Sequence, residues 1–154
     1  MHHDEPEICN CSSLRQAARH VSRLYDRALA PAGLGVNQYT ILSRLERFGP
    51  LSQRELAERL VMDRSTLGHL LRPLTGRGLI DIAPDPDDGR RKRLSLSAAG
   101  RRTLHEAWSL WADAQRRFER EFGSEPASGL RVTLAHVTNL SLITADAMTT
   151  EQLQ

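Results

Sequence analysis

Five polar side chains near the middle of the chain have the types and spacing needed to hydrogen-bond to nucleic-acid bases and phosphates. They are Arg64, Ser65, Thr66, His69 and Arg72. In a helix this spacing places them on one face, opposite the leucines of the same segment. Arginine can donate two hydrogen bonds to guanine, and hydroxyl groups can donate to or accept from bases and phosphates. The alternative is a solvated helix face whose first turn contains hydroxyl residues, which are common there.

A second polar cluster lies in the stretch PDPDDGRRK, where proline, aspartate and glycine predict a turn. Residues 89–102 contain six basic side chains and no acidic one. Three of these cations stand at the predicted tip: Arg90, Arg91 and Lys92. A narrow DNA minor groove attracts inserted arginine, and Asp88, two residues before Arg90, is expected to hold the Arg90 side chain. The alternative is a solvated charged loop.

The elements that position these two clusters are three helices and a hairpin. Apolar periodicity predicts helices over 36–48, 52–60 and 63–77 and strands over 79–83 and 93–96. Ser52 with Glu55 forms a capping box, and Asp63 is a good N-cap. The three-residue turn over 61–63 therefore predicts a helix-turn-helix, whose second helix places its first residues in the DNA major groove. Pro73, inside the last of these helices, is expected to bend it or end it early.

Longer helices are predicted on both sides of this segment, over 13–30, 97–122 and 128–148. A capping box of Ser13 and Gln16 is predicted to begin the first, and Ser97 is predicted to cap the second. Their apolar stripes are too extensive for the small central segment to bury, so we expect a second copy of the chain to cover them. A twofold dimer would then present two recognition helices to sites about one turn of DNA apart.

Composition excludes several classes of protein. The net charge is only +2, so the basic residues are informative through their clustering rather than their number. No apolar run approaches the ~18 residues of a membrane span, and the first residues do not form a signal-peptide pattern, so we expect a cytoplasmic protein without membrane contact. The sequence contains no glycine-rich phosphate loop, zinc-binding histidine pair or nucleophile elbow. We therefore expect no enzymatic activity, cofactor or metal.

Two adjoining stretches carry a specific family resemblance. The chain resembles the multiple-antibiotic-resistance-regulator (MarR) family most closely in LSQRELAERLVMDRSTLGHLLRPLTGRGLI followed by DPDDGRRKRLSLSAAG. The second stretch is similar to that family's wing signature, Asp-Pro-x-Asp-x-Arg and then Leu-Ser/Thr-x-x-Gly. The matching positions are Asp85, Pro86, Asp88, Arg90, Leu96, Ser97 and Gly100. The resemblance extends from about Leu14 to Ala145.

The resemblance implies a mainly α-helical winged helix-turn-helix protein with a small β-hairpin wing and dimerisation helices at both ends. Its homodimer would repress transcription from a pseudo-palindromic operator in duplex DNA. The implied dimerisation helices lie within 1–34 and 123–154, the DNA-binding domain spans 35–100, and a helix over 101–122 links them. Arg90 would enter the minor groove. DNA phosphates would be approached at a helix N-terminus, which suits anions, by Ser52, Gln53 and Arg54.

A small-molecule effector is a further implication, because family ligands are often held between the dimer helices and the DNA-binding domain. The candidate lining residues are Arg15, Arg19, His20, Tyr39, Trp108 and Trp111. Apolar walls with one or two cations suit an aromatic carboxylate. The alternative for the tryptophans is ordinary packing in a core or interface, and for the arginines it is a solvated or interface ion pair.

Oxidation is the competing signal. Cys9 and Cys11 lie just before the first predicted helix, and family members that sense organic hydroperoxides use a cysteine near that helix. A helix N-terminus favours the reactive thiolate, whereas the alternative is a pair of inert thiols. A winged-helix adaptor that binds protein instead of DNA is the remaining hypothesis, although such modules often lose the basic residues that this chain retains.

Overall fold

A computed structural model describes residues 9–141 of the chain and consists of helices and one hairpin. The elements are α1 (Asn10–Leu29), η2 (Ala30–Ala32), α2 (Val36–Phe48), α3 (Gln53–Leu60), α4 (Arg64–Gly76), β1 (Ile80–Pro84), β2 (Lys92–Leu96), α5 (Ala98–Phe122) and α6 (Ser124–Thr138). The predicted fold class, mainly α with a small hairpin, is confirmed. The chain divides after Arg116 into two compact units.

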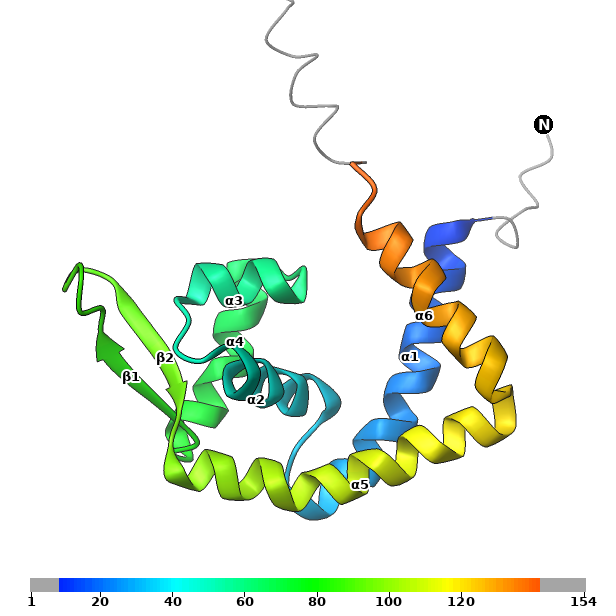
Figure 1. Cartoon of the computed structure of the whole chain (residues 1–154), viewed down its shortest axis with the longest axis horizontal. Coiled ribbons are helices and arrows are strands. Elements are labelled where there is room, and N and C mark those ends of the chain that lie inside the picture. The colour runs from blue at the N-terminus through cyan, green and yellow to red at the C-terminus, as the bar shows by residue number, and fades with distance from the viewer. Residues whose placement is uncertain (1–8, 142–154) are drawn as a thin grey trace, which may run out of the picture. The chain divides into compact units, whose positions relative to one another are not determined.

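Helices α3 and α4 begin at the capping residues that the sequence indicated. Ser52 Oγ accepts a hydrogen bond from the Glu55 backbone N–H at 3.2 Å, and Glu55 Oε2 accepts one from the Ser52 N–H at 2.7 Å. Asp63 Oδ1 accepts the backbone N–H of Thr66 at 2.8 Å. Val61 has a left-handed φ of 50° and ends α3, so the chain reverses into α4 within three residues. The two helices form the predicted helix-turn-helix (Figure 1).

The core of the first unit is mainly aliphatic and is centred on α2, α3 and α4. Its largest fully buried side chains there are Ile41, Leu42, Leu56, Leu67 and Leu74. Burying each of them stabilises the fold by roughly 1.5–3 kcal/mol relative to exposure. Figure 1 shows these three helices gathered beside the hairpin, which contributes further buried leucines to the same core.

The β1–β2 hairpin, which we call the wing, is attached to the helix-turn-helix through the middle of β2. The strands pair antiparallel, with Ile80 opposite Leu96 and Pro84 opposite Lys92. Leu51, just before α3, exchanges two backbone hydrogen bonds with Leu94 of β2, at 3.0 and 2.7 Å. These two bonds hold the wing against the segment that leads into α3.

The start of α5 explains the Ser-x-x-Gly part of the wing signature. Ser97 Oγ accepts the Gly100 N–H at 2.9 Å and donates its own proton to the Gly78 carbonyl at 2.6 Å. A Cβ on Gly100 would lie 2.0 Å from the carbonyl oxygen of Leu79. The predicted Ser97 cap is confirmed, and Gly100 is required because a backbone carbonyl occupies the space of any larger side chain.

The predicted start of α1 is wrong by three residues. The helix begins at Asn10 and its N-cap is Cys9, whose Sγ accepts the Ser12 backbone N–H at 3.4 Å. Ser13 lies inside the helix, and Gln16 Nε2 donates to Ser12 Oγ at 3.0 Å. The predicted Ser13 capping box fails because a sulfur atom takes the role that the sequence pattern assigned to a hydroxyl.

Two prolines are accommodated within helices. Helix α4 is not ended by Pro73, since it continues to Gly76 and the Pro73 carbonyl still accepts the Arg77 N–H at 3.1 Å. Helix α6 begins at Ser124, earlier than predicted, with Pro126 in its first turn, where no intrahelical N–H bond is lost. The predicted continuation of α6 to Met148 is wrong as far as it is described, because the helix ends at Thr138 with Asn139 as its C-cap, and residues 142–148 lie outside the described residues. No helix within residues 9–141 is long and apolar enough to cross a membrane.

Candidate nucleic-acid interface

The predicted recognition helix α4 presents its polar side chains together on one exposed face. Its buried side chains are Leu67, Leu71 and Leu74. The five predicted contact residues are all exposed: Arg64, Ser65, Thr66, His69 and Arg72. The structure therefore brings this predicted group together, while its contact with DNA stays a prediction.

In the first turn of α4, Asp63 and Thr66 form a side-chain hydrogen bond in addition to the predicted cap. Besides capping the Thr66 backbone, the Asp63 carboxylate accepts the Thr66 hydroxyl proton at Oδ2, with a separation of 2.5 Å. The hydroxyl and backbone donors of Thr66 lower the pKa of Asp63 below its ordinary value. The Asp63 side chain is consequently an anion that fixes the orientation of the Thr66 hydroxyl.

The predicted phosphate contacts at the start of α3 have structural partners within the protein. Ser52 uses its hydroxyl as the N-cap, and Gln53 Nε2 donates to the Arg64 carbonyl at 3.2 Å, which braces α3 against the first turn of α4. Arg54 Nε pairs with Glu58 at 2.8 Å, but both side chains remain largely exposed. Gln53 thus contacts the first turn of the recognition helix, and Arg54 is the one charged residue of the three.

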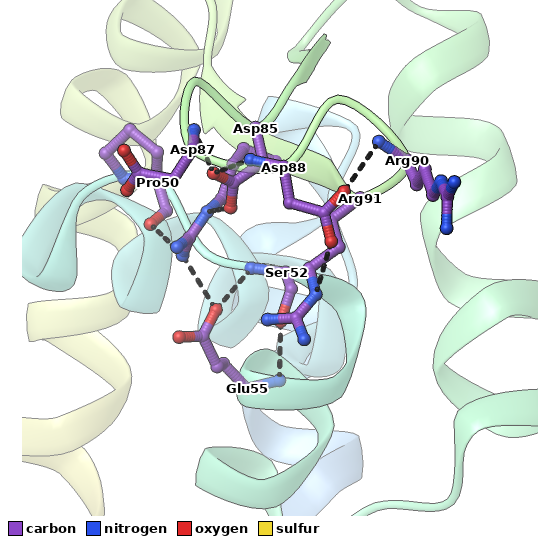
Figure 2. Close-up of polar contacts among 9 residues, drawn as sticks. Pro50, Ser52, Glu55, Asp85, Asp87, Asp88, Arg90 and Arg91 are labelled. Atoms are coloured by element: carbon purple, nitrogen blue, oxygen red, sulfur yellow. Dashed lines mark hydrogen bonds and ion pairs between the residues drawn. The ribbon is translucent and has the colours of Figure 1, made fainter.

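The wing turn is organised around one buried carboxylate, Asp85, which is only 6% exposed. Its Oδ1 accepts the backbone N–H groups of Asp87 at 2.9 Å and Asp88 at 3.4 Å, and its Oδ2 pairs with Arg93 Nε at 2.6 Å. The Asp87 backbone donor and then Arg93 lower the pKa of Asp85 below its ordinary value. Figure 2 shows Asp85 enclosed by the turn that it holds.

Arg93 links the wing to α3, a role that sequence reasoning missed. Its Nη1 pairs with Glu55 Oε2 at 2.8 Å and donates to the Pro50 carbonyl at 3.4 Å, while its Nε holds Asp85. The pKa of Glu55 is lowered first by the Ser52 N–H and also by Arg93. The signal available in the sequence was only an arginine in β2 and an aspartate before the turn, with no indication that Glu55 would meet them.

The expectation that Asp88 holds the Arg90 side chain is wrong. Asp88 Oδ1 accepts the Arg90 backbone N–H at 3.1 Å, and its Oδ2 lies 3.4 Å from Arg91 Nε. The short side chain of an aspartate in a turn readily accepts a hydrogen bond from the backbone N–H two residues ahead. The long side chain of that second residue extends away from the turn. Within the described part of the chain no carboxylate pairs with the Arg90 guanidinium, which points away from the turn in Figure 2.

A basic cleft of about 710 Å³ lies where α3, the start of α4 and the wing meet. Its cationic lining residues are Arg54, Arg64, Arg91, Lys92 and Arg93. Its acidic lining residues, Glu55, Glu58 and Asp85, are each paired with an arginine. Arg91 pairs with Asp88, so Arg64 and Lys92 are the lining cations without an ion pair among the described residues. Their positive charge suits a polyanion.

The predicted effector residues are only partly brought together. Tyr39 stacks on Trp111 with ring centroids 5.9 Å apart and an angle of 12°, and burial raises the pKa of Tyr39. Trp108 is 58% exposed. Three further candidates are exposed on α1: Arg15, Arg19 and His20. Among residues 9–141, these three form no hydrogen bond, ion pair or ring contact with the aromatic candidates, and a shared ligand pocket stays a prediction.

Both candidate redox residues, Cys9 and Cys11, are free and exposed thiols at the start of α1. In the part of the chain that the structure describes, no group of three or more histidine, cysteine or acidic side chains could hold a metal ion.

The sequence is similar to those of known transcription regulators. A family model described as MarR family matches residues 32–91. YxaD, an uncharacterised helix-turn-helix transcriptional regulator of Bacillus subtilis, is 36% identical over 84 residues, 54% of this chain and 54% of YxaD. The chain matches about half the length of each of its curated relatives.

Solved structures match over a larger share of the chain. A probable transcriptional regulator from Pseudomonas aeruginosa is 33% identical, with a TM-score of 0.76 over 85% of this chain and 98% of that one. The transcriptional repressor CouR, bound to a 23-mer DNA duplex, is 28% identical, with a TM-score of 0.80 over 88% and 96%. CouR from Rhodococcus jostii RHA1, bound to p-coumaroyl-CoA, is 25% identical, with a TM-score of 0.74 over 89% and 96%.

Proposed function

Because this chain belongs to the MarR family of transcription regulators, we propose that it binds duplex DNA as a homodimer in the cytoplasm and represses transcription. The observation that carries the proposal is the basic cleft between the recognition helix and the wing, flanked by an Arg90 guanidinium that has no partner among the described residues. Arginine and lysine side chains that neutralise phosphates give sequence-independent affinity, and the exposed face of α4 supplies base contacts.

The proposal also assigns a role to each part of the chain. DNA binding belongs to residues 35–100, dimerisation to helices within 1–34 and 123–154, and residues 101–122 connect them. Support comes from the exposed apolar side chains of the flanking helices, among them Leu14 in α1 and Val132 in α6. A twofold dimer would hold two copies of α4 against the two halves of a pseudo-palindromic operator.

The wing is tested with Arg90→Ala, measured by gel shift on the DNA that flanks the gene itself. Removing a guanidinium from the minor groove should weaken binding by about tenfold or more. Arg27→Ala is the matched control, because it removes an exposed positive charge from α1 outside both predicted DNA contacts. Equal affinities for the two variants would refute the wing role.

A salt titration separates DNA binding from the adaptor hypothesis. Affinity that rests on phosphate contacts falls steeply as salt rises. A winged-helix adaptor would show no affinity for duplex DNA even at low salt.

We further propose that a small aromatic or carboxylate ligand releases the protein from DNA. The stacked pair of Tyr39 and Trp111 offers an aromatic wall, and the similar protein CouR has been solved with p-coumaroyl-CoA. Each member of a panel of aromatic carboxylates would be added to the protein–DNA complex. Release by one of them, lost in Trp111→Leu, would support a metabolite sensor.

Oxidation is the alternative signal, favoured by two free, exposed thiols of which Cys9 also caps α1. Oxidation of Cys9 would change the size and polarity of the group that accepts the Ser12 N–H and disturb the first turn of a proposed dimerisation helix. Release of DNA by peroxide, abolished in Cys9→Ser or Cys11→Ser, would favour this mechanism over a ligand.

A further inference from the structure

The side chain of Thr66 is exposed in the first turn of the recognition helix, the part of a helix-turn-helix that faces base edges. A threonine hydroxyl ordinarily can donate one hydrogen bond and accept two, so it does not discriminate between base donors and base acceptors. A neighbour that fixes the direction of the hydroxyl proton would make the hydroxyl prefer either base donors or base acceptors.

Asp63 imposes that constraint. The Thr66 hydroxyl donates to Asp63 Oδ2 at 2.5 Å, while Oδ1 of the same carboxylate holds the Thr66 backbone N–H at 2.8 Å. An ionised carboxylate only accepts hydrogen bonds, so the hydroxyl proton must point toward Asp63. The outward side of Thr66 Oγ1 then carries lone pairs alone.

The neighbouring hydroxyl shows that this constraint is specific to one residue. Ser65 is also exposed in the same turn, yet its hydroxyl has no hydrogen-bond partner within the described part of the chain. Ser65 keeps both its donor and its acceptors for DNA, whereas Thr66 and Asp63 together present only acceptors.

We propose that the Asp63–Thr66 pair reads an exocyclic amine in the DNA major groove, the N4 amine of cytosine or the N6 amine of adenine. These are the groups that donate hydrogen bonds there, while guanine offers only acceptors. A DNA phosphate is an acceptor as well, so a hydroxyl without a free proton beside a carboxylate has no favourable contact with the backbone. This inference rests on the proposed DNA-binding function and makes Asp63 a positioning residue for Thr66.

The first step of the test locates the base pair. Wild type and Thr66→Val would be compared on an operator fragment in which every base pair is substituted in turn. Valine keeps the shape of threonine but lacks the hydroxyl, so we expect a preference of about tenfold to be lost at one base pair in each half-site. Ser65→Ala is the control and should leave that preference in place.

The second step asks which group is read. At the located base pair, the cytosine or adenine is replaced by an analogue that lacks the exocyclic amine. We expect the wild type to lose about tenfold in affinity and Thr66→Val to lose almost nothing on the same duplex. A wild type that binds both duplexes equally would overturn the inference.

The third step uses Asp63→Asn, which preserves the helix cap because asparagine is as good an N-cap as aspartate. With its Oδ1 on the Thr66 backbone, the asparagine amide would donate to Thr66 Oγ1 and free the hydroxyl proton to point outward. The penalty for removing the base amine should then shrink, because the hydroxyl can donate as well as accept, while the asparagine still caps the helix. A penalty as large as in the wild type would contradict the proposed role of Asp63.

The two levels of the proposal fail in different ways. Salt-dependent binding of the duplex by every variant, with identical base preferences, would refute amine reading while leaving DNA binding intact. Absence of duplex binding by the wild type at low salt would overturn the DNA-binding function itself and the inference with it.

Discussion

The central block, residues 34–100, buries more of its large apolar side chains than α6 and the start of α1 do. In the block, Leu56, Leu67 and Leu74 have no exposed surface. In α6, by contrast, Ala127 is the residue that is buried, and Val132 is 69% exposed. The first turns of α1 resemble α6, since Leu14 is 40% exposed.

This contrast indicates which part of the protein is complete in a single chain. The block buries most of its leucines in one core, which Leu29 of α1 and Ala107 of α5 complete, and anchors its wing through Leu51 and Arg93. The flanking helices present apolar surface to solvent, which costs free energy unless another surface covers it. The proposed homodimer supplies that surface, and the following experiments test whether the two regions differ in this way.

The largest effect is expected from Val132→Asp. A charge in the proposed dimer interface should separate the subunits, and because two linked recognition helices bind far more tightly than one, DNA affinity should fall by about 100-fold or more. Thr133→Asp places the same charge on the next exposed residue of α6. Sedimentation and gel shift would be measured for both variants. If both variants stayed dimeric, Val132 would lie outside the interface.

The block should respond to internal changes at its own packing contacts. Gly100→Ala forces a Cβ against the Leu79 carbonyl and should lower the free energy of unfolding by about 3 kcal/mol, a value at the upper end for overpacked sites. Gly76→Ala is the control, since no atom lies within 4 Å of its ideal Cβ, and it should be neutral or stabilising by about 0.5 kcal/mol. Urea denaturation at several protein concentrations measures both. Equal stabilities would mean that α5 shifts without cost.

A smaller effect is expected where the wing joins the block. Arg93→Lys keeps the charge but cannot reach Asp85 and Glu55 at once with a planar fork. The wing should loosen, amide exchange over residues 85–93 should speed up, and DNA affinity should fall by about tenfold because the loop must be ordered on binding. The dimer should be unaffected. Wild-type exchange rates in this variant would show that the strand pairing alone fixes the wing.

The smallest effect concerns pH. The pKa values of Glu55, Asp63 and Asp85 all lie below their ordinary values, so these carboxylates contribute stability that is fully present above their unfolded pKa near 4 and is lost as pH falls through the lower folded values. Their contribution should stay constant between about pH 5 and 8 and decline below about pH 4. Denaturation across this range, with Asp85→Asn for comparison, checks the sign. If acidification destabilised wild type and Asp85→Asn by the same amount, groups other than Asp85 would be responsible for the loss.

Local signals in the sequence were sufficient for much of the fold. Ser52 and Asp63 cap their helices as predicted, and Ser97 caps α5, because an N-cap bonds a backbone group only three residues away. The same reach explains the failure at α1, where Cys9 caps the helix and the pattern had indicated Ser13. Pro73 was misleading in one respect, since a proline near a helix end removes a single hydrogen bond that packing can outweigh.

The sequence by itself determined the helix-turn-helix, the wing and the residue types on the exposed face of α4, because each depends on neighbours within one or two turns of the chain. Only the tertiary structure decided how the charges pair. Arg93 pairs with Glu55, which lies 38 positions away in the sequence. Asp88 accepts a hydrogen bond from the backbone N–H of Arg90, not from its side chain. Such pairings follow from where the folded backbone places each group, and long flexible side chains take whichever partner lies within reach.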